Sequence, residues 1–243
     1  MYTYAYLAAA LFWMVIWAVL YVLARPQRRA TFWTALLLGP AGPISEYWFL
    51  QDYWRPIFAV EFSMGALRFG IEDYLATFAL AGVCAGVFEI LAARRGFPPL
   101  PRITLAALLR ATSWSSLGLG LMILIASLLH MGSIRSLLVV LPLTSLLMLA
   151  RHKRLLALAL PLAIASALTY WLFYLLVFVP AFPGVFDALW NLNQTWRIMW
   201  LGVPIEEFLW VGATMLYAGP FYRVCTGVPL DGGNRLESPP PTP

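Results

Sequence analysis

Two pairs of adjacent acidic residues stand at the heads of strongly apolar stretches of this sequence. The first lies in FGIEDYLATF, residues 69–78, and the second in LGVPIEEFLW, residues 201–210. Placing a charged side chain in an apolar membrane costs roughly 2.5–3.5 kcal/mol even on lenient scales, so ionisable residues there indicate a functional site. Two adjacent carboxyl groups also repel each other when both are ionised, so one proton is held tightly. Each pair can therefore supply a proton donor and a proton acceptor.

The candidate catalytic residues are these four acids and two acids that precede the first pair: Glu72, Asp73, Glu206, Glu207, Glu46 and Asp52. Neighbouring aromatic and amide side chains are candidates for contact with a substrate: Trp48, Tyr53, Trp54, Tyr74, Trp190, Asn193, Trp196 and Phe208. Two simpler explanations remain open. Acids at a helix start can act as caps, and Trp and Tyr also form belts at membrane surfaces.

The composition indicates an integral membrane protein. Of the 243 residues, 62% are hydrophobic and only 11% are charged, and the mean hydropathy is +0.79. Soluble domains, by contrast, carry about 25% charged residues. The net charge of +5 does not indicate nucleic-acid binding, because the basic residues cluster in loops between apolar stretches. In those loops they act as topology signals.

Seven apolar segments are candidates for transmembrane helices. They cover residues 3–24, 30–49, 71–92, 108–129, 134–150, 156–180 and 200–221. Most Lys and Arg residues follow the first, third, fifth and seventh segments, which places the N-terminus outside and the C-terminus inside. Most of the acids fall at the outer ends or in outer loops. We therefore expect an all-α, multi-pass protein of a cell membrane, the bacterial inner membrane.

The two acid-pair segments also resemble each other. Each has a Gly shortly before an aliphatic residue, which is followed directly by two acids, an aromatic residue and Leu at the start of an apolar helix. We therefore expect a 3+1+3 arrangement, with a three-helix repeat at 1–95, a connector helix at 96–133 and a second, parallel three-helix repeat at 134–223. Repeats of this kind commonly share a site at their interface. The polar, Pro-rich residues 224–243 are expected to form a disordered cytoplasmic tail.

Carboxylic acids and aromatic rings, without His, Lys or Cys, suit carbocation chemistry. Protonating an alkene needs a strong acid in a site that excludes water, and the faces of aromatic rings stabilise the resulting cation. This chemistry requires no metal ion and no organic cofactor, so we expect neither. The substrate would be apolar and would arrive from the lipid.

The second acid motif, GVPIEEFLW, resembles the Pro-Leu-Glu-Glu signature of the membrane lycopene cyclases of the heterodimeric bacterial and fused fungal type. The stretch WNLN, residues 190–193, is similar to that family's Trp-Asn-x-Asn stretch. DYW, residues 52–54, resembles the acidic residue that precedes the family's first motif. The first motif itself departs from the family pattern, with Gly70 where the family prefers Pro and Asp73 in the second acid position.

This resemblance implies a cyclisation of lycopene ends without net redox change. Glu206 and Glu207 would form one acid pair, and Glu72 and Asp73 the other. One acid would protonate the terminal double bond, the cation would close a six-membered ring, and a carboxylate would then remove a proton. The departures in the first motif leave room for another polyprenyl chain or a carotenoid with modified ends as the substrate.

Two other classes of function remain open. A small seven-span cyclase of a meroterpenoid pathway would also use acids, although such enzymes usually open an epoxide. A carotenoid- or lipid-binding membrane protein would use the acids only as helix caps. The expected partners are a lipid-soluble polyisoprenoid and membrane lipid, with self-association into a homo-oligomer left open and no nucleic acid.

Several other classes are excluded by missing residues. A retinal-binding protein needs a Lys within its last helix, and the only Lys, Lys153, is expected in a loop between the fifth and sixth segments. A flavin-dependent cyclase needs a Gly-rich dinucleotide-binding turn, which the sequence lacks. A membrane prenyltransferase needs spaced aspartates for Mg²⁺ and diphosphate, and no DxxxD motif occurs.

Overall fold

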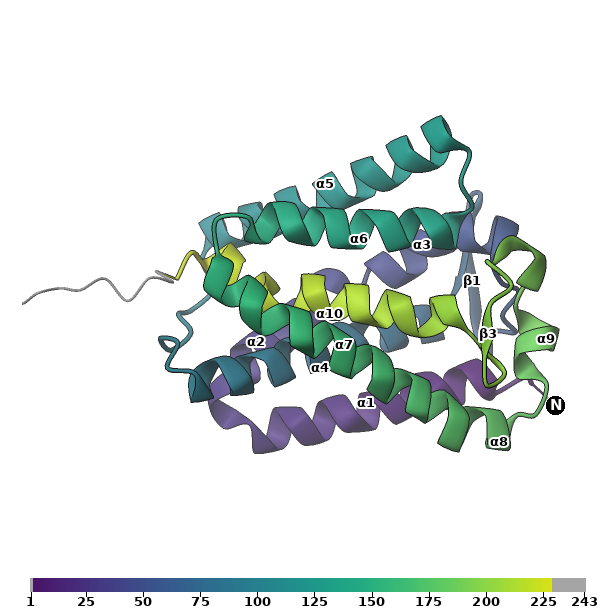
Figure 1. Ribbon diagram of the computed structural model, residues 1–243, viewed down its shortest axis with the longest axis horizontal. Helices are drawn as coiled ribbons and strands as arrows, with labels where there is room; N and C mark the ends of the chain where they lie inside the picture. The colour runs from purple at the N-terminus through teal and green to yellow at the C-terminus, as the bar shows by residue number, and fades with distance from the viewer. Residues whose placement is uncertain (1, 229–243) are drawn as a thin grey trace, which may run out of the picture.

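The computed structural model describes residues 2–228 as a mostly helical protein (Figure 1). Its helices are α1 (Ala5–Leu23), η1 (Arg25–Gln27), α2 (Arg28–Leu38), α3 (Ala41–Asp52), α4 (Ile71–Arg94), α5 (Leu105–Leu129), α6 (Ser133–Leu149), α7 (Lys153–Phe173), the π-helical turn η2 (Tyr174–Phe178), α8 (Val179–Ala181), α9 (Val185–Leu189), η3 (Leu192–Gln194) and α10 (Ile205–Thr226). Two short antiparallel hairpins interrupt this order. They pair β1 (Glu61–Met64) with β2 (Leu67–Gly70), and β3 (Met199–Trp200) with β4 (Val203–Pro204).

Within residues 2–228, four helical segments are long and apolar enough to cross a membrane. They are Ala5–Leu23, Ile71–Arg94, Leu105–Leu129 and Lys153–Ala181, and the apolar helix α6 is shorter. Large apolar side chains stay exposed on these segments, such as Val15 on α1, Leu128 on α5 and Ile164 on α7. A soluble monomer rarely exposes so much contiguous apolar surface. The length and composition of these helices are therefore compatible with a multi-pass membrane protein.

Helix α10 is not one of these four segments, because its charged residues lower its hydropathy. Glu206, Glu207 and Arg223 all fall within its 22 residues. Most of its side chains are nevertheless buried. The charged groups of α10 are thus surrounded by protein, as expected for ionisable residues within a membrane bundle.

Helices α4 and α10 pack against each other, and each has its own set of neighbours. Helix α4 packs against α1 and α2, whereas α10 packs against α6 and α7. In Figure 1, α10 crosses the middle of the view with α6 above it and α7 below it. The two central helices approach closely at Gly219 of α10, where an added Cβ would lie 3.2 Å from the ring of Phe88 on α4.

The segment expected as the second span, residues 30–49, is divided into two helices. The break falls at Gly39 and Pro40, because proline has no N–H with which to continue the α2 hydrogen bonds. Helix α3 then packs closely against the start of α4, since a Cβ at Gly42 would collide with the backbone oxygen of Asp73. This approach sets Glu46, one turn further along α3, beside the first acid pair.

Two boundaries near the end of the chain also differ from expectation. The seventh span, expected to begin at residue 200, begins at Ile205, because β3 and β4 occupy the preceding residues. Helix α10 continues through Thr226, so residues 224–226 of the expected disordered tail, 224–243, are helical. Gly227 ends the helix in the left-handed conformation, with φ of 67°. The expected tail from residue 229 onward lies outside the described residues.

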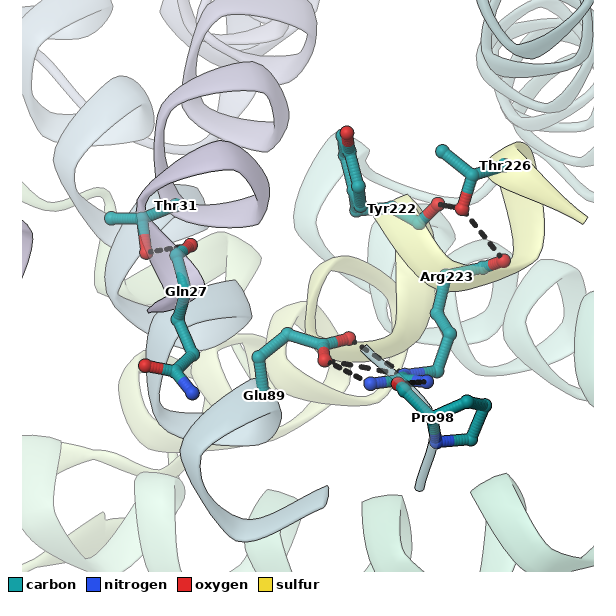
Figure 2. A network of polar contacts seen from close by, with 7 residues as sticks. All are labelled: Gln27, Thr31, Glu89, Pro98, Tyr222, Arg223 and Thr226. Carbon is teal, nitrogen blue, oxygen red and sulfur yellow. Dashed lines mark hydrogen bonds and ion pairs between the residues drawn. The ribbon is translucent and has the colours of Figure 1, made fainter. Parts of the chain in front are cut away.

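A buried ion pair joins α4 to α10 (Figure 2). Arg223 Nη2 lies 2.5 Å from Glu89 Oε2, and Arg223 Nε donates to both Glu89 oxygens at 3.0 and 3.2 Å. Arg223 Nη1 donates to the carbonyl oxygen of Pro98 at 2.9 Å. The two charged side chains are 2% and 1% exposed. Each charge therefore relies on the other for hydrogen bonds that water cannot supply.

Replacing Arg223 alone should strongly destabilise the fold. Arg223→Met leaves the Glu89 carboxylate buried without a partner, and we expect a loss of about 3–5 kcal/mol in the free energy of unfolding. The double variant Glu89→Met, Arg223→Met should recover most of this loss, since it removes both charges. Unfolding of the purified protein in detergent measures both effects. A single variant as stable as the unaltered protein would refute this role of the ion pair.

Candidate functional site

Each acid pair occupies the first turn of a central helix, directly after a hairpin. Glu72 and Asp73 begin α4, Glu206 and Glu207 begin α10, and all four side chains are buried. The free N–H groups at a helix start stabilise nearby carboxylates. Accordingly, the Gly70 N–H donates to Asp73 Oδ2 at 2.7 Å.

The first acid of each pair holds the chain segment that leads into the hairpin. Glu72 Oε1 accepts the backbone N–H of Ala59 at 2.6 Å, and Glu206 Oε1 accepts that of Trp196 at 2.5 Å. The second oxygen of each, Oε2, is buried without a hydrogen-bond partner among the described residues. Neither Glu72 nor Glu206 belongs to the lining of the large cavity described below. These two acids therefore fasten the segments that cover the helix starts.

The second acid of the first pair joins Glu46. Asp73 Oδ1 accepts the Tyr6 hydroxyl at 2.7 Å, and the Glu46 carboxyl group lies close to that of Asp73. Two buried carboxyl groups at close range repel each other when both are ionised, which favours a proton on one of them. Because Asp73 already accepts bonds from Tyr6 and Gly70, Glu46 is the better placed to carry it. The Trp54 indole N–H also contacts both Glu46 oxygens, at 3.1 and 3.3 Å.

The second acid of the other pair, Glu207, is surrounded by four donors. Its Oε1 accepts from the Tyr53 hydroxyl and from Trp190 Nε1 at 2.6 Å, and its Oε2 accepts from the Tyr174 hydroxyl at 2.7 Å and from Trp210 Nε1 at 3.4 Å. An ionised carboxylate accepts at both oxygens and has no donor of its own, so four donors facing Glu207 favour the charged form. Burial, and then the Glu207 charge, raise the pKa of the Tyr53 hydroxyl well above its ordinary value, which keeps Tyr53 a donor.

A cavity of about 550 Å³ connects Glu46 and Glu207, the two acids in its lining. Its wall is mainly apolar, and its aromatic members are Tyr6, Trp13, Trp48, Phe49, Tyr53, Trp54, Tyr170, Tyr174, Phe178, Trp190, Trp210 and Tyr217. Trp54 and Trp190, the donors to the two acids, pack with ring centroids 5.5 Å apart. The cavity therefore combines two carboxyl groups in different surroundings with many aromatic faces.

Part of the site expected from the sequence lines this cavity. Glu46, Glu207, Trp48, Tyr53, Trp54 and Trp190 do so, and Asp73 stands behind Glu46. Asp52 lies elsewhere: its carboxylate accepts the backbone N–H of Ser133 at 2.7 Å and the Ser133 hydroxyl, so it caps α6.

The remaining expected contacts lie outside the cavity lining. Asn193 accepts a hydrogen bond from Arg197 at 2.9 Å, and the Trp196 side chain is 45% exposed. Phe208 packs against Trp200, and Tyr74 packs against Phe78. These residues support the covering segments and the helix packing around the site.

Several cavity residues were not singled out from the sequence. Tyr6, Trp13, Tyr170, Tyr174, Trp210 and Tyr217 all line the cavity. One signal could have found some of them. Glu207, Trp210, Thr214 and Tyr217 follow one another at intervals of three and four residues, which places them on one helix face. Tyr170 and Tyr174 have the same four-residue spacing.

Among residues 2–228, no group of three or more His, Cys, Asp and Glu side chains is placed to hold a metal ion. No protein-family model matches the chain, and neither a curated protein nor a solved structure shows significant similarity to it. The chemistry of the cavity is therefore the basis for a functional proposal.

Removing the Glu72 carboxyl group should release the segment before the first hairpin. In Glu72→Ala the Ala59 N–H loses its acceptor, so its exchange with solvent hydrogen should accelerate at least about tenfold, which corresponds to about 1.4 kcal/mol. In Glu72→Gln an amide oxygen remains as acceptor, and exchange should stay close to that of the unaltered protein. Hydrogen–deuterium exchange with mass spectrometry measures both. Equal protection in Glu72→Ala would argue against the fastening role.

Proposed function

We propose that this chain is a cell-membrane cyclase that acts, without net redox change, on the end group of a carotenoid or another polyisoprenoid. The observation that carries the proposal is the placement of Glu46 and Glu207 around one aromatic-walled cavity. Asp73 lies beside Glu46, and four hydrogen-bond donors surround the carboxyl group of Glu207. A lycopene cyclase-like reaction needs an acid and a base that both face one dry site.

In the proposed reaction, Glu46 gives its proton to a terminal alkene. The neighbouring carbon becomes cationic, a second alkene of the chain attacks it, and a ring closes with the cation moved to a ring carbon. Glu207 then removes a proton next to that carbon, and a double bond forms. One proton enters and one leaves, so the product is an isomer of the substrate. Between turnovers Glu46 regains a proton and Glu207 loses one through exchange with water.

The aromatic wall suits this charge movement. A cation over the face of Trp or Tyr is stabilised by about 0.5–2 kcal/mol, and more strongly where water is excluded. Trp54 and Trp190 each donate an N–H to an acid, and their rings pack with centroids 5.5 Å apart in the cavity lining. Segments fastened by Glu72 and Glu206 cover the helix starts and limit the entry of water.

The same proposal includes seven spans in a 3+1+3 order. In it α1, α2 with α3, and α4 form one parallel repeat, α6, α7 and α10 form the other, and α5 connects them. The helix contacts support it, because α4 packs on α1 and α2 as α10 packs on α6 and α7. The contact between Glu89 and Arg223, 134 residues apart, supports it further, since Glu72 and Glu206 have the same separation.

Neutral variants of the cavity acids should abolish turnover. We expect Glu46→Gln and Glu207→Gln each to lower the rate of product formation by about 10²–10⁴-fold, the usual contribution of general acid–base catalysis. Asp187→Asn, which alters an exposed acid on α9, is the matched control and should retain full activity. Product is measured in membranes with equal amounts of inserted protein. Full activity in both cavity variants would reject the mechanism.

The substrate class can be tested by supplying membranes separately with lycopene, a hydroxylated acyclic carotenoid and a terminal epoxide of a polyprenyl chain. We expect a cyclic isomer of unchanged mass from at least one non-epoxidised compound, detected by chromatography and mass spectrometry. Conversion of the epoxide alone would instead support an epoxide-opening meroterpenoid cyclase. Unchanged carotenoid that co-purifies with the protein would support a binding protein.

A further inference from the structure

The hydroxyl group of Tyr217 is a polar group in the cavity lining that lies away from the two acids. Tyr217 lies on α10, and its side chain is only 6% exposed. Its hydroxyl oxygen is buried without a hydrogen-bond partner among the described residues. The Ser115 hydroxyl on α5 lies close to it. An unpaired hydroxyl in an apolar interior is unfavourable by about 1–3 kcal/mol, so a ligand that pairs with it gains affinity.

Other hydroxyl groups lie in the same part of the lining. Ser115 on α5 and Thr214 on α10 both line the cavity, and Thr214 precedes Tyr217 by three residues. Because residues three apart on a helix are neighbours, the Thr214 and Tyr217 side chains lie on one face of α10. A wall that contacted only hydrocarbon would be expected to carry apolar residues at these positions.

The distance between this position and the acid end follows from the helix. Glu207 and Tyr217 are ten residues apart on α10, which corresponds to about 15 Å at a rise of 1.5 Å per residue. Both side chains line the same cavity. One elongated ligand can therefore contact both.

We propose that Tyr217, with Ser115 and Thr214, binds a hydroxyl or carbonyl oxygen of the substrate about 15 Å from the alkene that reacts at Glu46 and Glu207. The substrate is then an oxygenated linear isoprenoid. A pure hydrocarbon leaves the Tyr217 hydroxyl unpaired, and sites with buried polar groups discriminate against ligands that lack the matching group. The unpaired indole N–H of Trp13, which also lines the cavity, is consistent with a ligand that carries an acceptor.

This inference rests on the proposed function for the identity of the reacting end, but its test uses binding alone. The ligands are geranylgeraniol and the corresponding hydrocarbon, in which hydrogen replaces the hydroxyl group. Binding to purified protein in detergent is followed by quenching of tryptophan fluorescence. We expect the unaltered protein to bind the alcohol more tightly than the hydrocarbon.

Tyr217→Phe should weaken binding of the alcohol by about fivefold to tenfold, the usual worth of a hydrogen bond within a membrane protein, and leave hydrocarbon binding unchanged. Thr214→Val, which keeps the side-chain shape, should act in the same direction. Tyr222→Phe is the matched control, because the Tyr222 hydroxyl donates to the Pro101 carbonyl oxygen outside the cavity lining. It should alter neither affinity.

Equal affinity of the unaltered protein for the two ligands, or an equal effect of Tyr217→Phe on both, would overturn the inference. Failure of the alcohol to bind would do the same. Failure of the proposed catalytic mechanism would be seen in a separate experiment, in which Glu46→Gln and Glu207→Gln keep their turnover. That result would not change the interpretation of the binding measurements.

Discussion

The carboxylate of Glu207 holds together parts of the chain that are far apart in sequence. Tyr53 follows α3, Tyr174 begins the π-helical turn, Trp190 follows α9, and all three donate to this one group. In an interior without water, each of these donors and the charge itself would be costly to leave unpaired. The need to pair this buried charge with its donors therefore positions both the cavity wall and the connecting segments. A π-helical turn, such as the one that carries Tyr174, is often found at functional sites.

Much of the fold could be predicted from the sequence, because its signals are local. Long apolar runs predicted α1, α4, α5 and the segment from α7 to α8, and adjacent acids predicted the buried starts of α4 and α10. The hairpins could not be predicted in the same way. A two-residue strand such as β3 has too few residues to show alternation, and its residues Met199 and Trp200 are as apolar as those of a membrane helix.

The candidate site could be predicted only in part, since its roles depend on contacts over long separations. Glu46 and Asp52 looked alike in the sequence, yet Glu46 meets the cavity through the close packing of Gly42 on α4, and Asp52 caps α6. Adjacent acids looked equivalent as well. The two acids of a pair make different contacts because neighbouring side chains in a helix point in directions about 100° apart.

The ion pair between Glu89 and Arg223 bears on how such a molecule could have originated. Under the proposed repeat, these residues occupy equivalent positions of the two halves. Two copies of the first half would bring carboxylate against carboxylate at this seam, and two copies of the second would bring guanidinium against guanidinium. Only unlike halves neutralise the contact. If the two halves arose by duplication and opposite charges were then fixed at this contact, each half would pair favourably with the other half. Neither half would pair favourably with a second copy of itself.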